Sequence, residues 1–323
     1  MRFFLIPMLL MSSLPLFADV MRVTILGSGT PRPDINRFSQ SILIEAGEEK
    51  LLFDAGRGAT IRLSQAQVNI GDINKVFLTH LHSDHTLGLP DLIMTGWIYQ
   101  RNKDLEVYGP EGTKEFVDNI KSAFIEDIKI RIKPPESHTE RGLRTKITEI
   151  QEGVIYQENG IKVSAFNVFH GGGVKHAFGY KIIYKNRSVV ISGDTNYSSN
   201  LVTYSKNVDL LIHEIADAPD SIKNRSSKVK GLMDYHTTPE EMARIIKEAS
   251  PRFTVLTHIL LLGGISETDT LNKVRSLVND LYEVEMAYDL MGIDVKDKII
   301  TYSLDYSDEK ENKNNWNIKY NRR

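Results

Sequence analysis

The sequence predicts an α/β fold in which helices cover the outer faces of β-sheet. Two observations carry this prediction. Short runs of apolar and β-branched residues alternate with helical segments through both halves of the 323-residue chain. Several of these runs also end directly in an ionisable side chain, as in open α/β sheets, where ligands gather beyond the carboxyl ends of the strands.

The first half of the chain contains short apolar runs separated by turn residues, which is the pattern of strands. The expected strands are 22–26, 41–45, 50–53, 75–78 and 105–108. The second and third of them should form a hairpin, because Ala46-Gly47-Glu48-Glu49 between them contains a turn-forming glycine. Helices are expected at 58–68 and 111–123.

Residues 126–150 differ from the segments on either side. They carry charges of both signs, contain Pro134-Pro135 and His138, and show little sustained periodicity. We expect an excursion from the core there, either a strand pair or a lid. A solvated connection without a function is an equally good interpretation.

The second half repeats the alternation of the first. The expected strands are 161–166, 180–184, 187–191, 209–212 and 253–256. Thr238-Pro239-Glu240-Glu241 is a capping box with proline at the first helical position, so a helix should run from there to Ala249. A further helix is expected at 267–281. The charged and amide-rich tail 307–323 is typical of disorder.

The N-terminus has the composition of a secretory signal peptide over residues 1–18. Arg2 precedes an apolar stretch from Phe3 to Met11, and Ala18 stands before Asp19. The segment is too short, and too interrupted by proline, to form a stable membrane anchor. Export to the periplasm or beyond follows from this interpretation. If Met21 were the true start, a cytoplasmic location would follow instead, and in either case residues 19–306 are expected to form one folded domain.

Composition limits the chemistry that is open to the chain. Apolar residues make up 41% and charged residues 25%, as in ordinary soluble domains, and the net charge of −2 provides no bulk attraction to nucleic acid or acidic membranes. A local basic groove remains compatible with that charge. Because there is no cysteine, disulfides and thiolate ligands are excluded, and any metal site must use His, Asp or Glu.

The segment His80-Leu81-His82-Ser83-Asp84-His85 follows the apolar run Val76-Phe77-Leu78. Imidazole and carboxylate are ligands suited to zinc and similar divalent metals. A polar turn that contains histidines by chance is the alternative interpretation. It is the weaker one, because the whole chain has only nine histidines and three of them fall within these six residues.

Other apolar runs also end in potential ligands. Val189-Val190-Ile191 leads to Asp194, Leu210–Ile212 leads to His213-Glu214, Val255-Leu256 leads to His258, and Val168-Phe169 leads to His170. Buried imidazoles and carboxylates are costly without partners, and metal ions can be those partners. These side chains are therefore expected to share one polar centre.

At these residues the chain resembles the metallo-β-lactamase superfamily, which implies a four-layer αβ/βα sandwich with a binuclear metal centre over residues 22–302. The motifs are Asp54 in Phe53-Asp54-Ala55-Gly56, the segment His80–His85, His170, Asp194 and His258. Within the superfamily the chain is similar to the ribonuclease Z and arylsulfatase-like branch, and most of all to exported arylsulfatase-type members. The segments behind this are Gly27–Pro31, Phe178-Gly179-Tyr180, Ser192–Thr195, His213-Glu214 and His236–Pro239.

The resemblance implies a role for each motif residue. His80, His82 and His170 would bind one metal, and Asp84, His85 and His258 the second. Asp194 would bridge both metals together with a hydroxide, which Asp84 would help to orient. Asp54 and His213 would support these ligands from behind. The metals are expected to be two Zn²⁺ ions, with Mn²⁺, Fe²⁺ or Co²⁺ open to the same nitrogen and oxygen ligands.

His236 precedes the helix capped by Thr238. The family resemblance makes it a catalytic acid that stabilises the transition state or protonates the leaving oxygen, with Glu214 holding its ring. A surface histidine near a helix start is the alternative. His176 is expected to be supporting or exposed.

Two substrate classes are compatible with these motifs. We expect a hydrolase of sulfate or phosphate esters of small molecules, similar to arylsulfatases and phosphodiesterases. The alternative is a ribonuclease Z-type endonuclease acting at the 3′ side of tRNA, the one case in which nucleic acid would be the partner. Against it, residues 126–150 are mixed in charge and no basic arm rich in glycine and proline is found. A β-lactamase or lactonase, and a metal-binding scaffold without activity, fit less well. A homodimer is open to the chain.

Overall fold

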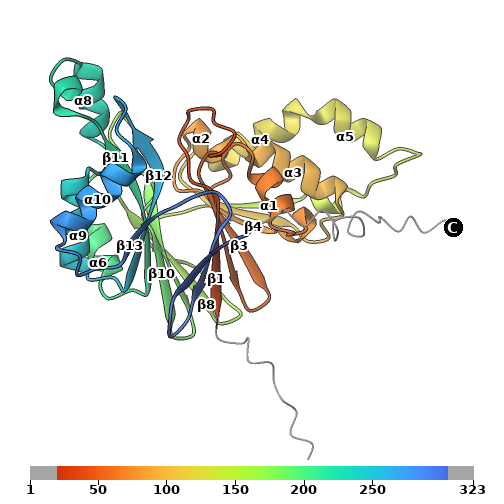
Figure 1. Ribbon diagram of the computed structural model, residues 1–323. Coiled ribbons are helices and arrows are strands. Elements are labelled where there is room, and N and C mark those ends of the chain that lie inside the picture. Colours follow the sequence, from red (N-terminus) through yellow and green to blue (C-terminus); the bar gives the residue numbers. More distant parts are fainter. Residues whose placement is uncertain (1–19, 305–323) are drawn as a thin grey trace, which may run out of the picture.

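The computed structural model describes residues 20–304. The signal-like segment 1–18 and the polar tail from 307 lie outside the described residues. Two β-sheets face one another, and helices cover the outer face of each sheet, as Figure 1 shows. The predicted α/β class and four-layer arrangement are therefore confirmed.

The first sheet has eight strands in the order β15-β14-β1-β2-β3-β4-β5-β6. In chain order they are β1 (Met21–Gly27), β2 (Ser41–Ala46), β3 (Glu49–Phe53), β4 (Lys75–Phe77), β5 (Leu105–Gly109), β6 (Thr145–Glu149), β14 (Met291–Val295) and β15 (Ile300–Ser303). β3 to β6 run parallel. The last two strands of the chain join this sheet through β1.

The second sheet has seven strands in the order β13-β12-β11-β10-β9-β8-β7. They are β7 (Gly153–Glu158), β8 (Ile161–Asn167), β9 (Phe178–Tyr184), β10 (Arg187–Ile191), β11 (Leu210–Asp217), β12 (Phe253–Leu261) and β13 (Val284–Met286). β10 to β13 run parallel. Parallel strands are buried on both faces, which explains why β10 and β11 read as continuous apolar runs.

The outer layers contain most of the helices. On the first sheet lie α1 (Ala59–Gln65), α3 (Leu89–Ile98), α4 (Thr113–Ala123) and α5 (Ile125–Arg131), and on the second α6 (Ser199–Ser205), α9 (Pro239–Ala249) and α10 (Glu267–Leu277). Short helices stand at the upper edge of Figure 1: α2 (Ser83–Thr86), α7 (Asp220–Lys223) and α8 (Ser227–Met233). Two 3₁₀ turns are η1 (Ile70–Asp72) and η2 (Glu140–Leu143). Within residues 20–304, no helix has the length and apolarity needed to cross a bilayer.

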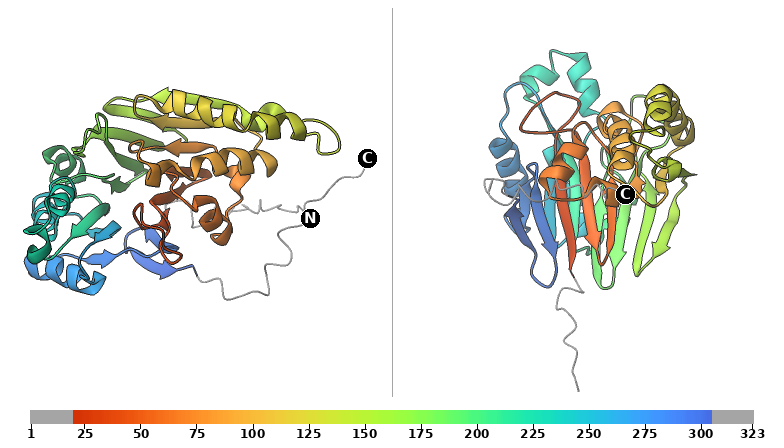
Figure 2. Two further views of the ribbon diagram at one scale, coloured as in Figure 1. Left: turned by 90° about the horizontal axis from the view of Figure 1, so that it is seen from above. Right: turned by 90° about the vertical axis from the view of Figure 1, so that its right-hand side faces the viewer.

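The core between the sheets is rich in aromatic rings. Phe77 stacks on Phe53 and on Tyr108, with ring centroids 4.9 and 4.8 Å apart. Tyr180 of the facing sheet packs edge-on against Phe77 at 6.0 Å. The Tyr180 hydroxyl also donates a hydrogen bond of 2.5 Å to the Leu78 carbonyl, which joins the two sheets immediately before the histidine segment. Figure 2 shows the two layers and their helices from two further directions.

All expected strands are present, but several helices have other bounds. The first two helices and the last are shorter than predicted. The helix expected at 111–123 begins at Thr113 because Gly112 has φ 95°, and the one expected at 267–281 ends at Leu277, since Asn279 and Asp280 take left-handed conformations. The prediction did not contain α3, β7, β14 or β15.

The expected excursion at 126–150 is divided in two by the structure. Its last residues, 145–149, form β6 and pair with β5, so that part belongs to the core sheet. The preceding part is the helix α5 and the turn η2, not a strand pair. The Trp97 indole donates to the Thr139 carbonyl at 2.8 Å and holds this part against α3.

Candidate metal centre

The potential ligands converge at one edge of the sandwich. His80, His82, Asp84 and His85 lie in the loop after β4 and in α2. His170 and Asp194 follow β8 and β10, whereas Glu214 and His258 lie within β11 and β12. Since β4, β10, β11 and β12 each lie in a parallel block, their carboxyl ends meet at this edge. His80 and His258 are 178 residues apart in the sequence, and the two facing sheets bring them together.

The first group of ligand atoms belongs to His80, His82 and His170. Their nitrogens lie within 4.8 Å of one another, and His170 Nε2 is 3.2 Å from His82 Nδ1. His80 and His170 are buried, whereas His82 is exposed and lines the cavity. Three nitrogens that converge in this way can share one cation.

The second group consists of Asp84, His85 and His258. Asp84 Oδ2 is 3.1 Å from His258 Nε2 and 3.6 Å from His85 Nε2. His258 is the extra residue of a bulge between β11 and β12 and has φ 43°. A non-glycine residue rarely takes that conformation, so the backbone is strained at His258. The bulge turns this imidazole toward the group.

Asp194 lies between the two groups. Its carboxylate oxygens are 3.4 Å from His85 Nε2 and 3.3 Å from His258 Nε2 on one side. On the other side they are 4.0 Å from His80 Nε2 and 3.9 Å from His170 Nε2. A carboxylate in this position can bind two cations at once.

Gly193 lets the backbone bring Asp194 this close. It has φ 62°, and a Cβ there would lie 2.6 Å from the Phe178 carbonyl oxygen. Only glycine avoids that clash and takes that conformation without strain.

The residues fit divalent cations. Ligands bound tetrahedrally at about 2.0–2.1 Å lie about 3.4 Å from one another, which is close to the separations measured here. Among the described residues, the buried Nε2 atoms of His80 and His85 have no hydrogen-bond partner. Orphaned buried nitrogens that point at a carboxylate are costly unless a cation binds them. The set contains only nitrogen and oxygen, so it suits zinc but also other divalent metals.

The electrostatics of three unliganded groups, His80, His170 and Asp194, favour cation binding. Burial lowers the pKa of His80 well below its ordinary value and that of His170 to about 4, so both rings are neutral and can ligate. Burial acts against ionisation of Asp194, but His258 and His85 outweigh it and hold the pKa of Asp194 well below its usual range. The carboxylate is therefore charged.

Asp54 lies behind the histidine segment. Its Oδ2 is 2.7 Å from His85 Nδ1, and its Oδ1 accepts from the Thr79 backbone N–H at 2.8 Å. Asp54 is itself buried and has φ 55° at the end of β3. A carboxylate that accepts the Nδ1 proton leaves the His85 Nε2 lone pair directed at the site.

His236 and Glu214 form a buried pair beside the ligand groups. His236 Nδ1 lies 2.8 and 3.0 Å from the two carboxylate oxygens of Glu214. Burial opposes a charge on His236, but the Glu214 carboxylate outweighs it and raises the pKa of His236 to about 9. Glu214 also accepts from the Thr195 backbone N–H at 2.5 Å, so its position is fixed. The ring of His236 is 5.2 Å from that of His170.

The remaining histidines lie away from the ligand atoms. His213 is buried and its Nδ1 is 2.8 Å from the Glu214 carbonyl oxygen, so it supports the strand that carries Glu214. His176 is half exposed, with its Nε2 3.5 Å from Glu111. His138 contacts Glu136 at 3.2 Å in the helical excursion.

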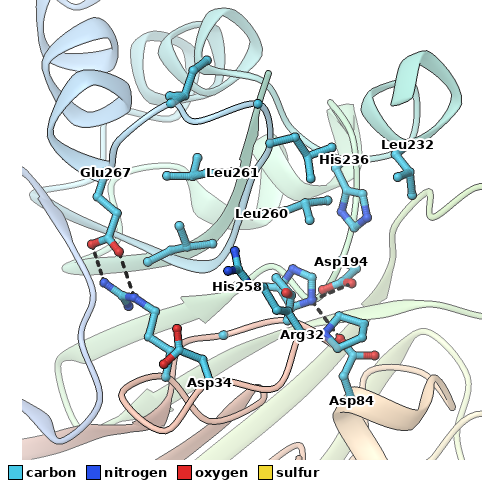
Figure 3. Close-up of a pocket in the computed structure, with 18 of the residues that line it drawn as sticks. Arg32, Asp34, Asp84, Asp194, Leu232, His236, His258, Leu260, Leu261 and Glu267 are labelled. Carbon is cyan, nitrogen blue, oxygen red and sulfur yellow. Dashed lines mark hydrogen bonds and ion pairs between the residues drawn. The ribbon is translucent and has the colours of Figure 1, made fainter. Parts of the chain in front are cut away.

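A cavity of about 1030 Å³ opens onto the ligand groups. One wall is the loop 29–37. The opposite wall is the apolar run after His258, drawn with Leu260 and Leu261 in Figure 3. Leu232 and Tyr235 close the side next to His236. No residue of 126–150 lines this cavity.

The sequence prediction missed these walls. Arg32, Leu232, Tyr235 and the run Ile259–Leu262 contact the cavity and were not singled out. One signal was available, because four apolar residues directly after a ligand histidine at a strand end would have to face either the core or the site. No spacing rule marks Leu232 or Arg32, which reach the cavity only through the path of their loops.

Fold and site together define the class: a metal-dependent hydrolase with a metallo-β-lactamase fold. The sequence model of the family described as anti-Pycsar protein Apyc1 matches residues 21–244. A ribonuclease Z of Mycobacterium sp. (strain KMS) is 32% identical over 244 residues, which is 75% of this chain and 85% of that one. The ribonuclease Z of Mycobacterium marinum is 30% identical over 282 residues, or 83% and 99% of the two chains.

Solved structures agree with this class. Human tRNase Z, short form, superposes with a TM-score of 0.63 at 25% identity and covers 85% of this chain and 99% of its own. The Bacillus subtilis metallo-β-lactamase fold protein YhfI gives 0.65 at 21% identity, covering 85% and 100%. The chain belongs to the metallo-β-lactamase superfamily, in its ribonuclease Z branch and within the family of that matching sequence model. A special closeness to arylsulfatase-type members remains a prediction.

Proposed function

We propose that this protein hydrolyses phosphodiester bonds, with RNA of the tRNA-precursor type as the leading substrate. The observation that carries the proposal is the Glu214–His236 pair beside two groups of ligand atoms that Asp194 joins. This arrangement offers cation sites for a phosphoryl group and a separate proton donor for a leaving oxygen. The relatives named ribonuclease Z support a phosphorus centre over a sulfur centre.

The ligand assignment forms part of the proposal. His80, His82 and His170 would hold one divalent ion, Asp84, His85 and His258 a second, and Asp194 both. Zinc is our preferred metal, with manganese or iron as alternatives. When bound, two such ions would activate water and neutralise the charge that develops on the phosphoryl oxygens.

The protein's own groups would move the protons. The Asp84 carboxylate, 3.1 Å from His258 and at the cavity floor, would orient the attacking water and accept its proton. His236 would enter the reaction protonated and donate from Nε2 to the departing oxygen, since its Nδ1 faces Glu214. Glu214 would keep the ring in that orientation and stabilise its charge. The cavity walls would exclude bulk water from the reacting atoms.

The small-molecule sulfate or phosphate ester favoured by the sequence alone now ranks below the RNA phosphodiester. Its support was the signal-like segment 1–18, the arylsulfatase-like run from His170 to Thr195 and the lack of net positive charge. Export remains a proposal. The lack of a basic arm still distinguishes this chain from the tRNA-clamping pattern, because residues 126–150 carry charges of both signs and form α5, η2 and β6. If the protein is exported, its RNA substrate would have to be extracellular or periplasmic.

Metal-loaded protein should be tested on three substrates: a tRNA precursor with a 3′ trailer, bis(p-nitrophenyl) phosphate and p-nitrophenyl sulfate. We expect cleavage of both phosphodiesters, abolished by a chelator and restored by zinc or manganese. RNA cleavage should weaken steeply as salt rises, because phosphate contacts release counterions. Turnover of the sulfate alone would contradict the phosphodiester proposal, and cleavage of only the nitrophenyl diester would exclude the tRNA precursor.

A further inference from the structure

Two arginines of the loop 29–37 line the cavity, and they differ in their contacts, because one is paired with protein groups and the other is not. Arg37 is fully engaged. It pairs with the Glu267 carboxylate through Nε and Nη2, and its Nη1 donates to Ser28 Oγ at 2.6 Å and to the Ala287 carbonyl at 2.8 Å. These contacts tie the loop to the far wall, where α10 begins, as Figure 3 shows for Glu267.

The ends of the same loop are fixed by one buried carboxylate. Asp289 accepts from the Ser28 backbone N–H at 2.9 Å and from the Phe38 N–H at 2.7 Å. Arg62 Nε donates to it as well, at 3.0 Å. The two ends of the loop at Ser28 and Phe38 therefore have fixed positions on either side of the segment that lines the cavity.

Arg32 stands in this loop without a protein partner. Among residues 20–304 no hydrogen bond or ion pair involves its guanidinium, although this exposed side chain lines the cavity. The nearest acid in sequence, Asp34, uses its Oδ1 to accept from the Asn36 N–H at 2.9 Å within its own turn. The charge of Arg32 is thus free to face a ligand.

We propose that Arg32 binds a second, non-reacting phosphate of the substrate and so selects phosphodiesters that carry one. This inference rests on the proposed function. The ligand cluster would bind the reacting phosphoryl group. The unpaired Arg32 guanidinium elsewhere in the cavity is therefore available for another anionic group. A guanidinium matches phosphate oxygens with two parallel hydrogen bonds.

A matched pair of chromogenic substrates tests this role. Thymidine 5′-(p-nitrophenyl phosphate) has one phosphodiester, and its 3′-phosphorylated form adds a phosphate without changing the leaving group. For the unmodified protein we expect a KM about tenfold lower for the 3′-phosphorylated form. In Arg32→Ala that preference should vanish, with kcat for the plain diester within about twofold of the parent value, since only ground-state binding is lost.

Binding without turnover provides an independent measurement. Calorimetric titration of zinc-loaded protein with thymidine 3′,5′-bisphosphate and with thymidine 5′-monophosphate should show tighter binding of the bisphosphate, and Arg32→Ala should remove the difference. Arg32→Lys should retain part of it, because lysine keeps the charge but not the fork. Arg141→Ala, which removes an exposed arginine of η2 outside the cavity, is the charge-matched control and should change nothing.

The outcomes separate the two proposals. If both substrates turn over but Arg32→Ala weakens them equally or leaves the preference intact, the role of Arg32 is wrong and the phosphodiesterase proposal stands. If neither substrate turns over, the proposed function fails. The calorimetric comparison then still decides the role of Arg32, because an equal affinity for both nucleotides would overturn it.

Discussion

The two sheets contribute to the metal centre in different ways. The first sheet delivers His80, His82, Asp84 and His85 from one loop after β4. The second sheet delivers His170 and Asp194 from the loops after β8 and β10, and His258 from the bulge within β12. The first contribution is local in sequence, whereas the second exists only when β8, β10 and β12 stand in register.

The difference shows what each half requires of the fold. The loop of the first sheet needs a brace, and Asp54 together with the Tyr180 hydroxyl provides it. The ligands of the second sheet need an unusual backbone conformation, because Gly193 must have φ 62° and His258 must occupy a bulge. A ligand on the second sheet should therefore be harder to replace than a brace on the first.

The largest effect is expected from Asp194, the residue that joins the two ligand groups. Asp194→Asn keeps the shape but removes the charge that the two cation sites share, so phosphodiesterase activity should fall by about 10³-fold or more. Elemental analysis after dialysis should show fewer metal ions per protein than in the parent. Asp118→Asn, an exposed carboxylate on α4, is the control and should leave metal content and activity as they are. Full activity in Asp194→Asn would disprove a shared carboxylate.

His236→Ala should follow in size. General acids typically contribute about 10²–10⁴-fold, so kcat should fall by that amount for a substrate with a poor leaving group such as an RNA diester. For a nitrophenolate, which leaves without protonation, the loss should be much smaller. Metal content should be unchanged, because His236 belongs to the reacting side and not to either main ligand group. His176→Ala, a half-exposed histidine outside the site, is the control.

An equal loss on both leaving groups would point to a binding role for His236. A drop in bound metal would instead make His236 a ligand. Metal content is worth measuring because His236 also forms an alternative ligand group with His170 and Asp194.

The same contrast explains how much could be predicted from the sequence. The histidine segment was visible because four ligands lie within six residues, and β4 before it is a buried apolar run. His170, Asp194, Glu214 and His258 were visible because each follows a short apolar run of the kind found in buried strands. Their convergence on one cavity needed only the rule that carboxyl ends share an edge.

What the sequence could not reveal depends on loop paths and strand pairing across long separations. The frame around Asp289 joins Ser28, Phe38 and Arg62 across more than 220 residues, and no local pattern marks it. The bulge at His258 lies within an ordinary apolar run, so β12 appeared to stop at Leu256. Likewise β6 was assigned to an excursion, because its alternation is weak at the edge of the sheet.

Asp54→Asn tests the brace of the first sheet and should have a smaller effect than the loss of Asp194. Asparagine cannot take the Nδ1 proton of His85 as a carboxylate does, and outer-sphere partners of this kind typically contribute about 10–100-fold to metal affinity. Competition with a chromogenic chelator should therefore show weaker retention of one metal equivalent, while saturating metal restores most of the activity. Unchanged affinity would mean that packing alone positions His85, and a loss as large as that of Asp194→Asn would remove the contrast between the two halves.

Glu214→Gln should give the smallest change in rate at neutral pH but a clear change in the pH profile. A general acid must be protonated to act, so activity falls as pH rises through the pKa of His236. The Glu214 carboxylate raises that pKa to about 9, and bound cations would lower it, so the basic limb of the parent protein should lie at or below about pH 9. Glutamine removes the negative charge, and the limb should move down toward the ordinary histidine value of 6.5. Measuring kcat from pH 5 to 10 on an RNA diester, with metal held saturating, follows this shift. If the basic limb stays in place in Glu214→Gln, another group causes it. His236 would then be a positioning residue on the second sheet.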